Sequence, residues 1–252
     1  MSSAILITGA SSGLGAALAE IYAAPGARLF LGGRDGERLE KVAAICRAKG
    51  AETELALIDV TDRAATEKWV LGSDDKSPLS LVIANAGISA GTGNRLGETA
   101  EQTRAIFAAN LDGLLNTVLP IIPRMQARKS GQIALMASLA GFFGAPGAPA
   151  YCASKAAVRV WGEGLRGWLG GFGIGVSVIC PGFVETAMTA RNRFPMPFLM
   201  KAPEAARIMR AGIDRNRARI TFPWPLAALV WLLALLPPGW LAKLMGRAPK
   251  KS

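Results

Sequence analysis

Two residues whose types and spacing suggest chemistry are Tyr151 and Lys155, which lie four positions apart in a segment of helical composition. Side chains four residues apart lie on one face of a helix, so the phenol and the ammonium are expected to point into the same space. A phenol titrates near pH ~10, and an ammonium a few ångströms away favours the phenolate and lowers the phenol pKa. We therefore predict that Tyr151 exchanges a proton with a substrate and that Lys155 lowers its pKa.

A hydroxyl group is expected close to this pair. The apolar run of residues 131–137 begins with a glycine and predicts a buried strand, and Ser138 follows at its carboxyl end. A serine in that place can hydrogen-bond a substrate oxygen. A tyrosine four residues before a lysine also occurs by chance on solvated helices, so the interpretation depends on what the remaining chain places around the pair.

The length and composition of the sequence limit the classes of protein to consider. Its 252 residues suffice for one α/β domain with a large core, and no Pro/Ser-rich linker divides them. The start carries no basic segment typical of a secretory signal, so we expect a cytoplasmic protein. The sequence has no histidine and three widely spaced cysteines, which excludes histidine-based catalysis and makes a metal site unexpected.

The net charge of +11 favours anionic partners such as phosphorylated ligands, acidic membranes or nucleic acid. No basic stripe interleaved with aromatic residues is present, and no nucleic-acid motif. Nucleic acid is therefore not an expected partner.

The beginning of the chain predicts a strand, a glycine-rich turn and a helix in that order. Residues 4–8 form a continuous apolar run, as expected of a central parallel strand, and residues 16–22 have helical spacing. Between them, Gly9, Gly13 and Gly15 let the backbone approach a ligand, and the free N–H groups at the helix start favour a pyrophosphate. The spacing differs from the general G-x-G-x-x-G fingerprint, and a plain strand-to-helix connection is the alternative.

The end of the second predicted strand, residues 28–31, indicates which dinucleotide would bind. An acidic residue there bonds the adenosine 2′-hydroxyl, whereas a cation suits a 2′-phosphate. The sequence has Gly33 and Arg34 at this place, and a guanidinium matches a phosphate in shape and charge. The presence of Arg34 rather than an acidic residue favours NADP(H) over NAD(H). The alternative is that Arg34 is a solvated residue at a helix start, with its field weakened by Asp35.

The remaining strands are expected at residues 54–60, 79–84, 131–138, 174–180 and 219–222, and the polar patch 73–78 predicts a surface loop. One helix is expected over residues 101–125, where Asn110 interrupts an apolar face; it either makes a structural hydrogen bond to a neighbouring strand or belongs to a proton relay. Seven strands alternating with six helices predict an α/β, Rossmann-like, doubly wound parallel sheet with helices on both faces. Ligands of such sheets bind beyond the carboxyl ends of the strands, which here hold Gly9, Arg34, Asp59, Asn85, Ser138 and Pro181.

The ordered set of motifs resembles the short-chain dehydrogenases/reductases in their single-domain form. The resemblance covers residues 4 to about 222, and each motif is weak alone although the ordered set is specific. The motifs are Thr8-Gly9-x-x-x-Gly13-x-Gly15, Asp59-Val60, Asn85-Ala86-Gly87, Asn110, Ser138, Tyr151-x-x-x-Lys155 and Pro181-Gly182. Arg34 after the second strand resembles the NADP-preferring members.

The resemblance implies an NADPH-dependent carbonyl reductase or alcohol dehydrogenase that is a homodimer or homotetramer. Ser138 would hold the carbonyl oxygen, Tyr151 would protonate it, and Lys155 would bond the nicotinamide ribose. Asn110 would position a water that continues the relay. A non-catalytic NADPH-binding module is the alternative, although such a protein has no need of the acid/base pair. Cofactor contacts are implied for Gly9, Ser11, Ser12, Gly13, Leu14, Gly15, Arg34, Asp59, Val60, Asn85, Ala86, Gly87, Tyr151, Lys155, Pro181, Gly182, Val184 and Thr186.

The C-terminal tail, residues 223–252, departs from this pattern and is treated as a segment separate from the NADP-binding domain, residues 1–222. Residues 222–241 carry no charge, and Lys243, Arg247, Lys250 and Lys251 follow. Prolines leave an apolar run of about a dozen residues, too short for the ~20 that span a bilayer. The tail is expected to be an interfacial helix on the inner face of an anionic membrane, a subunit contact or a lid.

The apolar residues 194–200, in the expected lid after Pro181-Gly182, favour a large apolar substrate such as a lipid ketone. Ordinary core or oligomer packing is the alternative for both apolar stretches.

Overall fold

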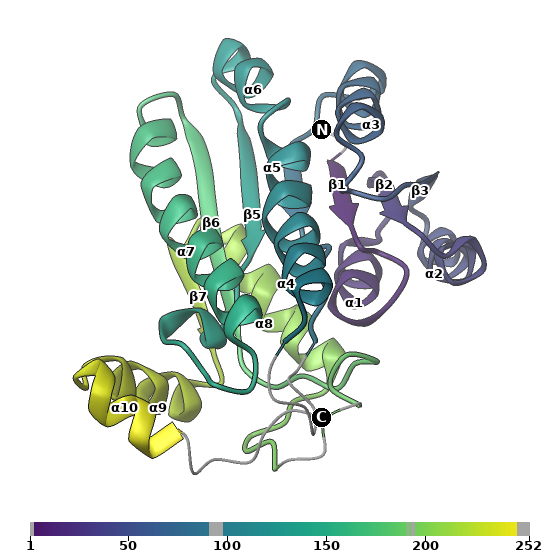
Figure 1. Cartoon of the computed structure of the whole chain (residues 1–252). Helices are drawn as coiled ribbons and strands as arrows, with labels where there is room; N and C mark the ends of the chain where they lie inside the picture. Colours follow the sequence, from purple (N-terminus) through teal and green to yellow (C-terminus); the bar gives the residue numbers. More distant parts are fainter. Residues whose placement is uncertain (1–2, 91–97, 191, 193–194, 246–252) are drawn as a thin grey trace.

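The protein is described by a computed structural model that covers residues 3–90, 98–190, 192 and 195–245. Seven strands form one sheet in the order β3-β2-β1-β4-β5-β6-β7, and every neighbouring pair is parallel (Figure 1). The predicted doubly wound fold is confirmed. The strands are β1 (Ala4–Thr8), β2 (Arg28–Gly33), β3 (Glu52–Leu57), β4 (Leu81–Ala84), β5 (Gly131–Met136), β6 (Ile174–Pro181) and β7 (Arg219–Phe222).

Alternate residues of the strands point to opposite faces of the sheet, and each face has its own hydrophobic core. Ile5 and Ile7 of β1 pack with α1 and α8, whereas Leu6 between them packs on the opposite face with α5 and α7. Both faces are covered, which explains why the strands read as continuous apolar runs. The helices are α1 (Gly13–Tyr22), α2 (Gly36–Ala48), α3 (Arg63–Lys76), α4 (Ala100–Phe107), α5 (Gly113–Val118), α6 (Ile122–Arg128), α7 (Pro149–Gly170), α8 (Ala202–Asp214), α9 (Trp224–Ala234) and α10 (Pro238–Met245).

The helix expected over residues 101–125 is interrupted. A π-helical turn, η1 (Ala108–Asp112), separates α4 from α5, and Asn110 lies within it. Such turns occur frequently at functional sites because the extra residue redirects a side chain. The stretch Ala100–Arg128 is long and apolar enough to cross a membrane by composition, but half of its apolar window is buried inside this domain, as expected of a core helix.

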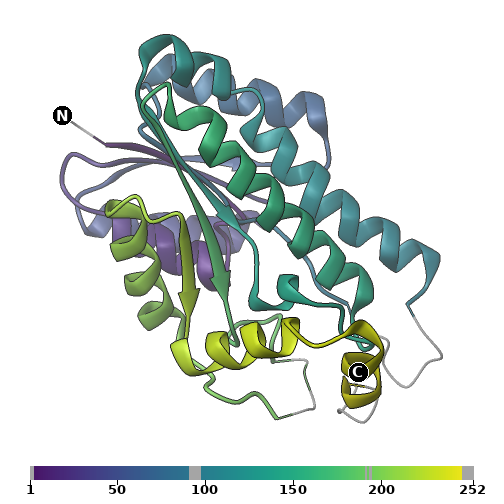
Figure 2. The ribbon, with the colours of Figure 1, turned by 90° about the vertical axis from the view of Figure 1, so that its left-hand side faces the viewer.

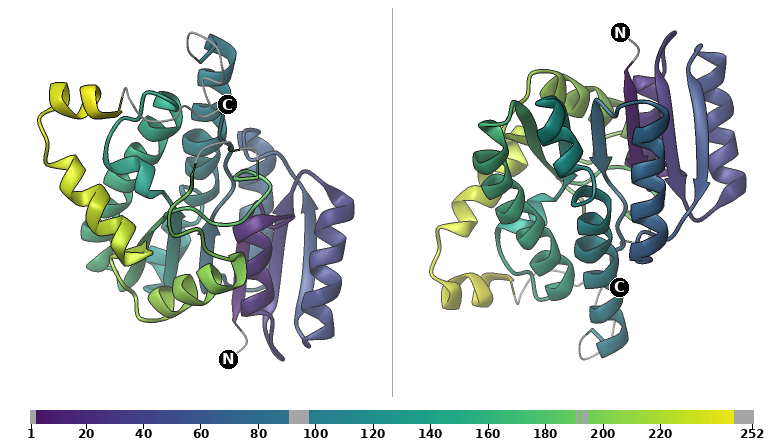
Figure 3. Two further views of the ribbon diagram at one scale, coloured as in Figure 1. Left: turned by 90° about the horizontal axis from the view of Figure 1, so that it is seen from below. Right: turned by 90° about the horizontal axis from the view of Figure 1, so that it is seen from above.

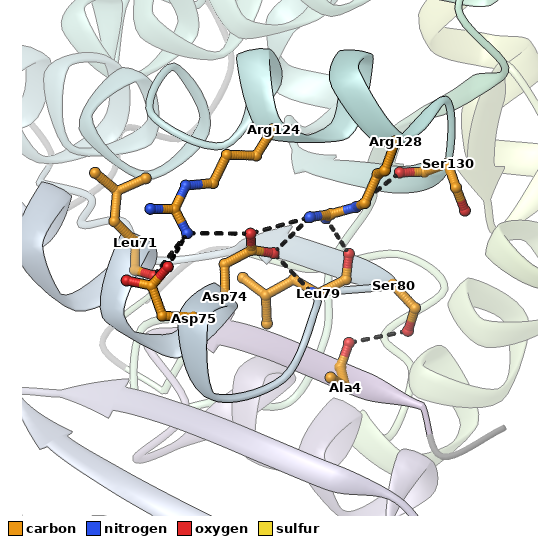
Figure 4. A network of polar contacts seen from close by, with 9 residues as sticks. All are labelled: Ala4, Leu71, Asp74, Asp75, Leu79, Ser80, Arg124, Arg128 and Ser130. Carbon is orange, nitrogen blue, oxygen red and sulfur yellow. Dashed lines mark hydrogen bonds and ion pairs between the residues drawn. The ribbon is translucent and has the colours of Figure 1, made fainter.

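The prediction of a surface loop at residues 73–78 is wrong, because α3 continues to Lys76 and buries Asp74. Figure 4 shows the reason: Arg128 Nη1 lies 2.8 Å from Asp74 Oδ1, and Arg124 Nη1 lies 3.3 Å from Asp74 Oδ2. The Leu79 amide also donates to Asp74 at 2.8 Å. This network ties α3 to α6 and to the entry of β4, and it has a structural role.

The tail folds into α9 and α10, which lie near the carboxyl ends of the strands (Figures 1 and 2). Leu226 and Val230 of α9 join the core that covers α7, and α9 contacts β7 and the short 3-10 helix η2 (Leu139–Phe142). The edge of the sheet at which ligands bind is therefore flanked by the tail.

Candidate active site

The structure brings Ser138, Tyr151 and Lys155 together at the carboxyl end of β5. Ser138 follows β5, and the first two turns of α7 carry Tyr151 and Lys155. Lys155 Nζ lies 5.9 Å from the centroid of the Tyr151 ring. Tyr151 and Ser138 are joined by a side-chain hydrogen bond. The predicted cluster of a phenol, an ammonium and a hydroxyl is present.

The expected lowering of the Tyr151 pKa by Lys155 is not found. Burial raises the pKa of Tyr151, and the hydrogen bond with Ser138 only opposes this effect. Lys155 instead donates from Nζ to the carbonyl of Met136 at 2.7 Å. Its side chain is 4% exposed, and burial lowers the pKa of Lys155 to about 8. Burial therefore favours the uncharged form of both groups.

Ser138 is held in place from two sides. Its Oγ accepts a hydrogen bond from the amide of Ala140 at 3.1 Å, as the N-cap of η2, and lies 3.4 Å from the carbonyl oxygen of Pro181. These contacts orient the hydroxyl between the ends of β5 and β6. Ser138 is thus placed to hold a substrate oxygen next to the Tyr151 phenol.

Asn110 uses its whole carboxamide for contacts within the protein. Oδ1 accepts from the Ile88 amide at 2.7 Å, and Nδ2 donates to the Ile88 carbonyl at 3.0 Å and to Ser154 Oγ at 3.0 Å. Ser154 Oγ in turn donates to the Tyr151 carbonyl at 2.8 Å. The structural hydrogen bond expected as one alternative is therefore found, with the segment after β4 rather than with a strand. Asn110 acts as a positioning residue for the Tyr151 turn.

Gly87 lies between the Asn110 and Lys155 side chains. A Cβ at Gly87 would lie 2.9 Å from Asn110 Oδ1 and 3.4 Å from Lys155 Nζ. Only a residue without a side chain leaves both groups in place. The segment 85–87 is therefore part of the site through its backbone.

The turn after β1 has the shape of an anion cradle. Gly9 and Gly13 have φ values of 66° and 58°, and a Cβ on Gly15 would lie 2.1 Å from the Gly9 carbonyl oxygen. Ser12 is the N-cap of α1 but makes no side-chain capping bond, so the first amides of α1 are free to bind an anion. Ser11, Ser12 and Leu14 lie in this same turn.

Thr8 belongs to the glycine motif of the sequence but was given no role in the predicted site, and the structure shows what it does. Its Oγ1 accepts from the amides of Asn85 at 3.0 Å and Ala86 at 3.1 Å, and Asn85 Nδ2 donates to the Thr8 carbonyl at 2.9 Å. These hydrogen bonds hold the segment after β4 against the end of β1, where the glycine turn begins. A buried hydroxyl at the end of an apolar strand was the signal that could have identified it.

Arg34 and Asp59 meet at the edge formed by β2 and β3. Arg34 Nη1 lies 3.7 Å from Asp59 Oδ2, and both side chains are exposed. The Thr61 amide donates to Asp59 Oδ1 at 3.0 Å. This hydrogen bond is the main cause of the lowered pKa of Asp59, and the charge of Arg34 lowers the pKa further. A Cβ on Gly33 would lie 3.2 Å from Ser11 Oγ, so Arg34 follows a residue that touches the glycine turn.

The strand expected over residues 54–60 runs instead from Glu52 to Leu57, because its pairing with β2 ends where Gly33 meets Leu57. Asp59 and Val60 therefore lie beyond the strand. The Val60 side chain packs against Gly113 of α5, where a Cβ would lie 2.5 Å from Val60 Cγ2.

The segment after β6 folds back over the glycine turn. A Cβ on Gly13 would lie 3.1 Å from Thr186 Cγ2, and buried Val184 bridges to Met200. Pro181 ends β6, and the Gly182 amide donates to the Phe222 carbonyl at 2.8 Å. Of the expected lid residues, Phe194 lies outside the described residues, whereas Phe198 and Leu199 are exposed.

Comparison with known proteins gives matches over most of the chain. The family model for short chain dehydrogenases matches residues 3–195. An uncharacterised oxidoreductase of Myxococcus xanthus is 41% identical over 233 residues, which are 92% of each chain.

Solved structures give the same result. A short-chain dehydrogenase from Sphingobium yanoikuyae in complex with NADPH is 30% identical, with a TM-score of 0.82 over 99% of this chain and 98% of that one. The bulky-bulky ketone specific alcohol dehydrogenase from Comamonas testosteroni is 26% identical, with a TM-score of 0.77 over 93% and 95% of the two chains. A short chain dehydrogenase from Mycobacterium paratuberculosis bound to NAD is 23% identical and shares the fold, with a TM-score of 0.75 over 87% and 94%.

Proposed function

The chain belongs to the short chain dehydrogenase family, and from this premise we propose that it is an NADPH-dependent carbonyl reductase, or alcohol dehydrogenase in the reverse direction. Its substrate is a ketone or secondary alcohol with apolar, lipid-like substituents. The observation that carries the proposal is the hydrogen-bonded pair of Ser138 and Tyr151, with Lys155 beside it, at the edge that also carries the glycine turn.

The residues present fit a dinucleotide. The Gly9–Gly15 turn and the uncapped start of α1 suit the pyrophosphate, because added Cβ atoms would fill the space that the backbone leaves. Lys155 and Tyr151 would hold the nicotinamide ribose. When bound, the dinucleotide supplies a hydride at the nicotinamide C4.

Arg34 supports NADPH over NADH. It provides a cation at the end of β2, where NAD-binding sheets carry an acid. Its side chain is 68% exposed, so it is accessible to a 2′-phosphate, but the Asp59 carboxylate, 3.7 Å away, competes for the guanidinium. The NADPH complex of the Sphingobium yanoikuyae protein is in keeping with this preference. Because the fold also accommodates NAD in a more distant protein, the two dinucleotides have to be compared directly.

The chain's own residues account for proton delivery to the carbonyl oxygen. Burial keeps the Tyr151 phenol protonated, which suits a proton donor during ketone reduction, and Ser138 stabilises the phenolate as the proton leaves. Lys155, with a pKa of about 8, still carries its proton near neutral pH and lies on the same side of α7 as the Tyr151 ring. Asn110 contributes by fixing Ile88 and, through Ser154, the Tyr151 turn.

The apolar character of the substrate is inferred from the surroundings of Ser138. Phe142 and Phe143 lie four and five residues after it, Phe183 follows Gly182, and all three pack partly buried against the core that includes Leu139. These apolar side chains on the two segments that flank Ser138 favour ketones with bulky hydrocarbon groups. The ketone specificity of the Comamonas testosteroni relative agrees with this proposal.

The test follows NADPH oxidation by the purified protein against ketones and 3-keto acyl compounds of rising chain length, with NADH in parallel. The chain has two tyrosines, so Tyr151→Phe is compared with Tyr22→Phe, which changes a residue far from the site. Turnover should rise with chain length, prefer NADPH, be lost in Tyr151→Phe and persist in Tyr22→Phe. Tight NADPH binding without turnover of any substrate would contradict the proposal and support a non-catalytic binding module.

The association into a homodimer or homotetramer and the cytoplasmic location stay predictions. Sedimentation velocity of the purified protein and fractionation of expressing cells test them.

A further inference from the structure

The tail helix α9 is apolar around its whole circumference, yet only one side of it is covered. No charged residue occurs from Pro223 to Ala242. Of the eleven residues of α9, the structure buries Leu226 and Val230. A helix that is apolar all round is normally buried in a core or in lipid. The outer side of α9 therefore needs an apolar neighbour that this chain does not supply among its described residues.

Three exposed residues of α9, together with Leu235 directly after it, share one face. Trp224, Ala228, Trp231 and Leu235 follow the spacing of four, three and four residues that places side chains above one another on a helix. Leu226 and Val230, also four apart, lie on the opposite side and hold the helix on the domain. Trp224 is 79% exposed and Trp240 of α10 is 71% exposed. We define the tail surface as the exposed side chains of Trp224, Ala228, Leu229, Trp231, Leu232, Leu235, Trp240 and Leu244.

We propose that the tail surface docks the protein onto an anionic phospholipid bilayer, with α9 and α10 lying in the headgroup region. An α-helix of eleven residues is about 16 Å long, whereas the hydrocarbon core of a bilayer is about 30 Å thick, so α9 cannot span it. Three of the six tryptophans of the sequence lie on this surface. Tryptophan is the side chain that membrane interfaces favour, because its apolar ring carries a polar N–H.

The charges around the tail surface favour lipid over a second copy of the chain. Lys243 of α10 is exposed, and the sequence continues with Arg247, Lys250 and Lys251, which lie outside the described residues. No acidic residue occurs after Asp214. Anionic headgroups would complement these cations. A contact between identical tails would bring two positively charged segments together with no acidic residue to compensate them.

The tail surface also has a defined relation to the catalytic edge. A Cβ on Gly182 would lie 2.7 Å from Leu226 Cδ2 and 3.4 Å from Leu139 Cδ1, so the inner side of α9 touches both segments that flank Ser138. In Figure 3 (left), α9 and α10 form the outer margin of this side of the molecule. Docking would turn the carboxyl edge of the sheet towards the bilayer. If the proposed function holds, an apolar ketone could then enter from the lipid phase; the docking itself does not depend on that function.

The experiment is co-sedimentation of the full chain with vesicles of equal parts phosphatidylglycerol and phosphatidylcholine, and with phosphatidylcholine alone. The wild type is compared with the double variant Trp224→Asp/Trp231→Asp and with the control Trp168→Asp, which changes a tryptophan of α7 that is 58% exposed. The wild type and the control should bind the anionic vesicles, and the double variant should bind about tenfold less. Binding should weaken with salt and on vesicles of phosphatidylcholine alone.

Several results would overturn the inference. Wild-type protein that stays in the supernatant, or a double variant that binds as well as the wild type, would show that the tail surface does not dock on lipid. A wild-type dimer that the double variant converts to a monomer, without vesicle binding by either, would assign the surface to a second copy. Circular dichroism and turnover of a short, water-soluble ketone check each variant, so a failure of docking is distinguished from a failure of the proposed activity.

Discussion

Lys155 allows a prediction about stability that does not depend on knowing the substrate. The side chain is 4% exposed, and burial lowers its pKa from 10.5 to about 8. The unfolded chain keeps this proton up to pH 10.5, so between the two values the unfolded state binds more protons than the folded state. Stability therefore rises with pH across this window, and the cost of burying the charge is fully present below pH 8. At about 1.4 kcal/mol per unit of pKa, the cost is about 3 kcal/mol.

Lys155→Met removes this cost together with the hydrogen bond to the Met136 carbonyl, which contributes about 1 kcal/mol. In the absence of dinucleotide, the variant should therefore be about 2 kcal/mol more stable than the wild type at about pH 7. The wild type should regain about 2 kcal/mol relative to the variant as the pH rises to about 10.

The assay is urea unfolding of both proteins at a series of pH values, with the exposed Lys68→Met of α3 as the control. Titrations common to all three proteins cancel in the differences. A difference between the wild type and Lys155→Met that does not change with pH would refute the reasoning, because it would show that the Lys155 ammonium pays no cost of burial. A similar pH dependence for Lys68→Met would refute its assignment to Lys155.

Three further substitutions test separate parts of the account. Tyr151→Phe should lower kcat by about 1,000-fold while the Kd for NADPH, measured by fluorescence titration, stays nearly unchanged, and retention of most of the activity would contradict the proton-transfer role. Arg34→Ala should raise the Kd for NADPH about tenfold and leave that for NADH unchanged; equal losses for both would count against the phosphate contact. Asp74→Ala should lower the free energy of urea unfolding by about 3 kcal/mol, because it leaves Arg128 without its carboxylate, and a loss below about 1 kcal/mol would disprove a stabilising network.

The sequence predicts well the features that depend on residues close together in the chain. Strands covered on both faces read as apolar runs, so β1, β4, β5 and β6 lie close to their expected positions. The order of strands, turns and helices then placed the predicted site residues at one edge of the sheet, because parallel strands end on the same side. The uninterrupted apolar run of the tail likewise corresponds to α9.

The features that were missed depend on contacts between distant segments. Asp74 reads as part of a polar loop, and its burial depends on Arg128, which lies 54 residues further along the chain. The π-helical turn at Asn110 was not predicted, because the asparagine marked a break in the apolar face but not the extra residue of the turn. The predicted effect of Lys155 on the Tyr151 pKa considered only the spacing along the helix, whereas Lys155 Nζ donates to a carbonyl of β5, 19 residues away.

The edge strand β3 was predicted at residues 54–60 but runs from Glu52 to Leu57. Its residues are only partly buried, and pairing with β2 determines where it ends. An apolar run therefore marks its position less clearly than it marks the central strands.

The proposed reaction is hydride transfer from NADPH to a ketone at the edge of the sheet that carries Ser138, Tyr151 and Lys155. The most direct measurement uses NADPH deuterated at the nicotinamide C4, in each of its two configurations, and mass spectrometry of the alcohol formed by the purified protein. We expect that one of the two configurations delivers deuterium to the carbinol carbon, and that Tyr151→Phe forms labelled product about 1,000-fold more slowly. An alcohol without deuterium from either configuration, or bound NADPH that is never oxidised by any ketone offered, would contradict the proposed reaction.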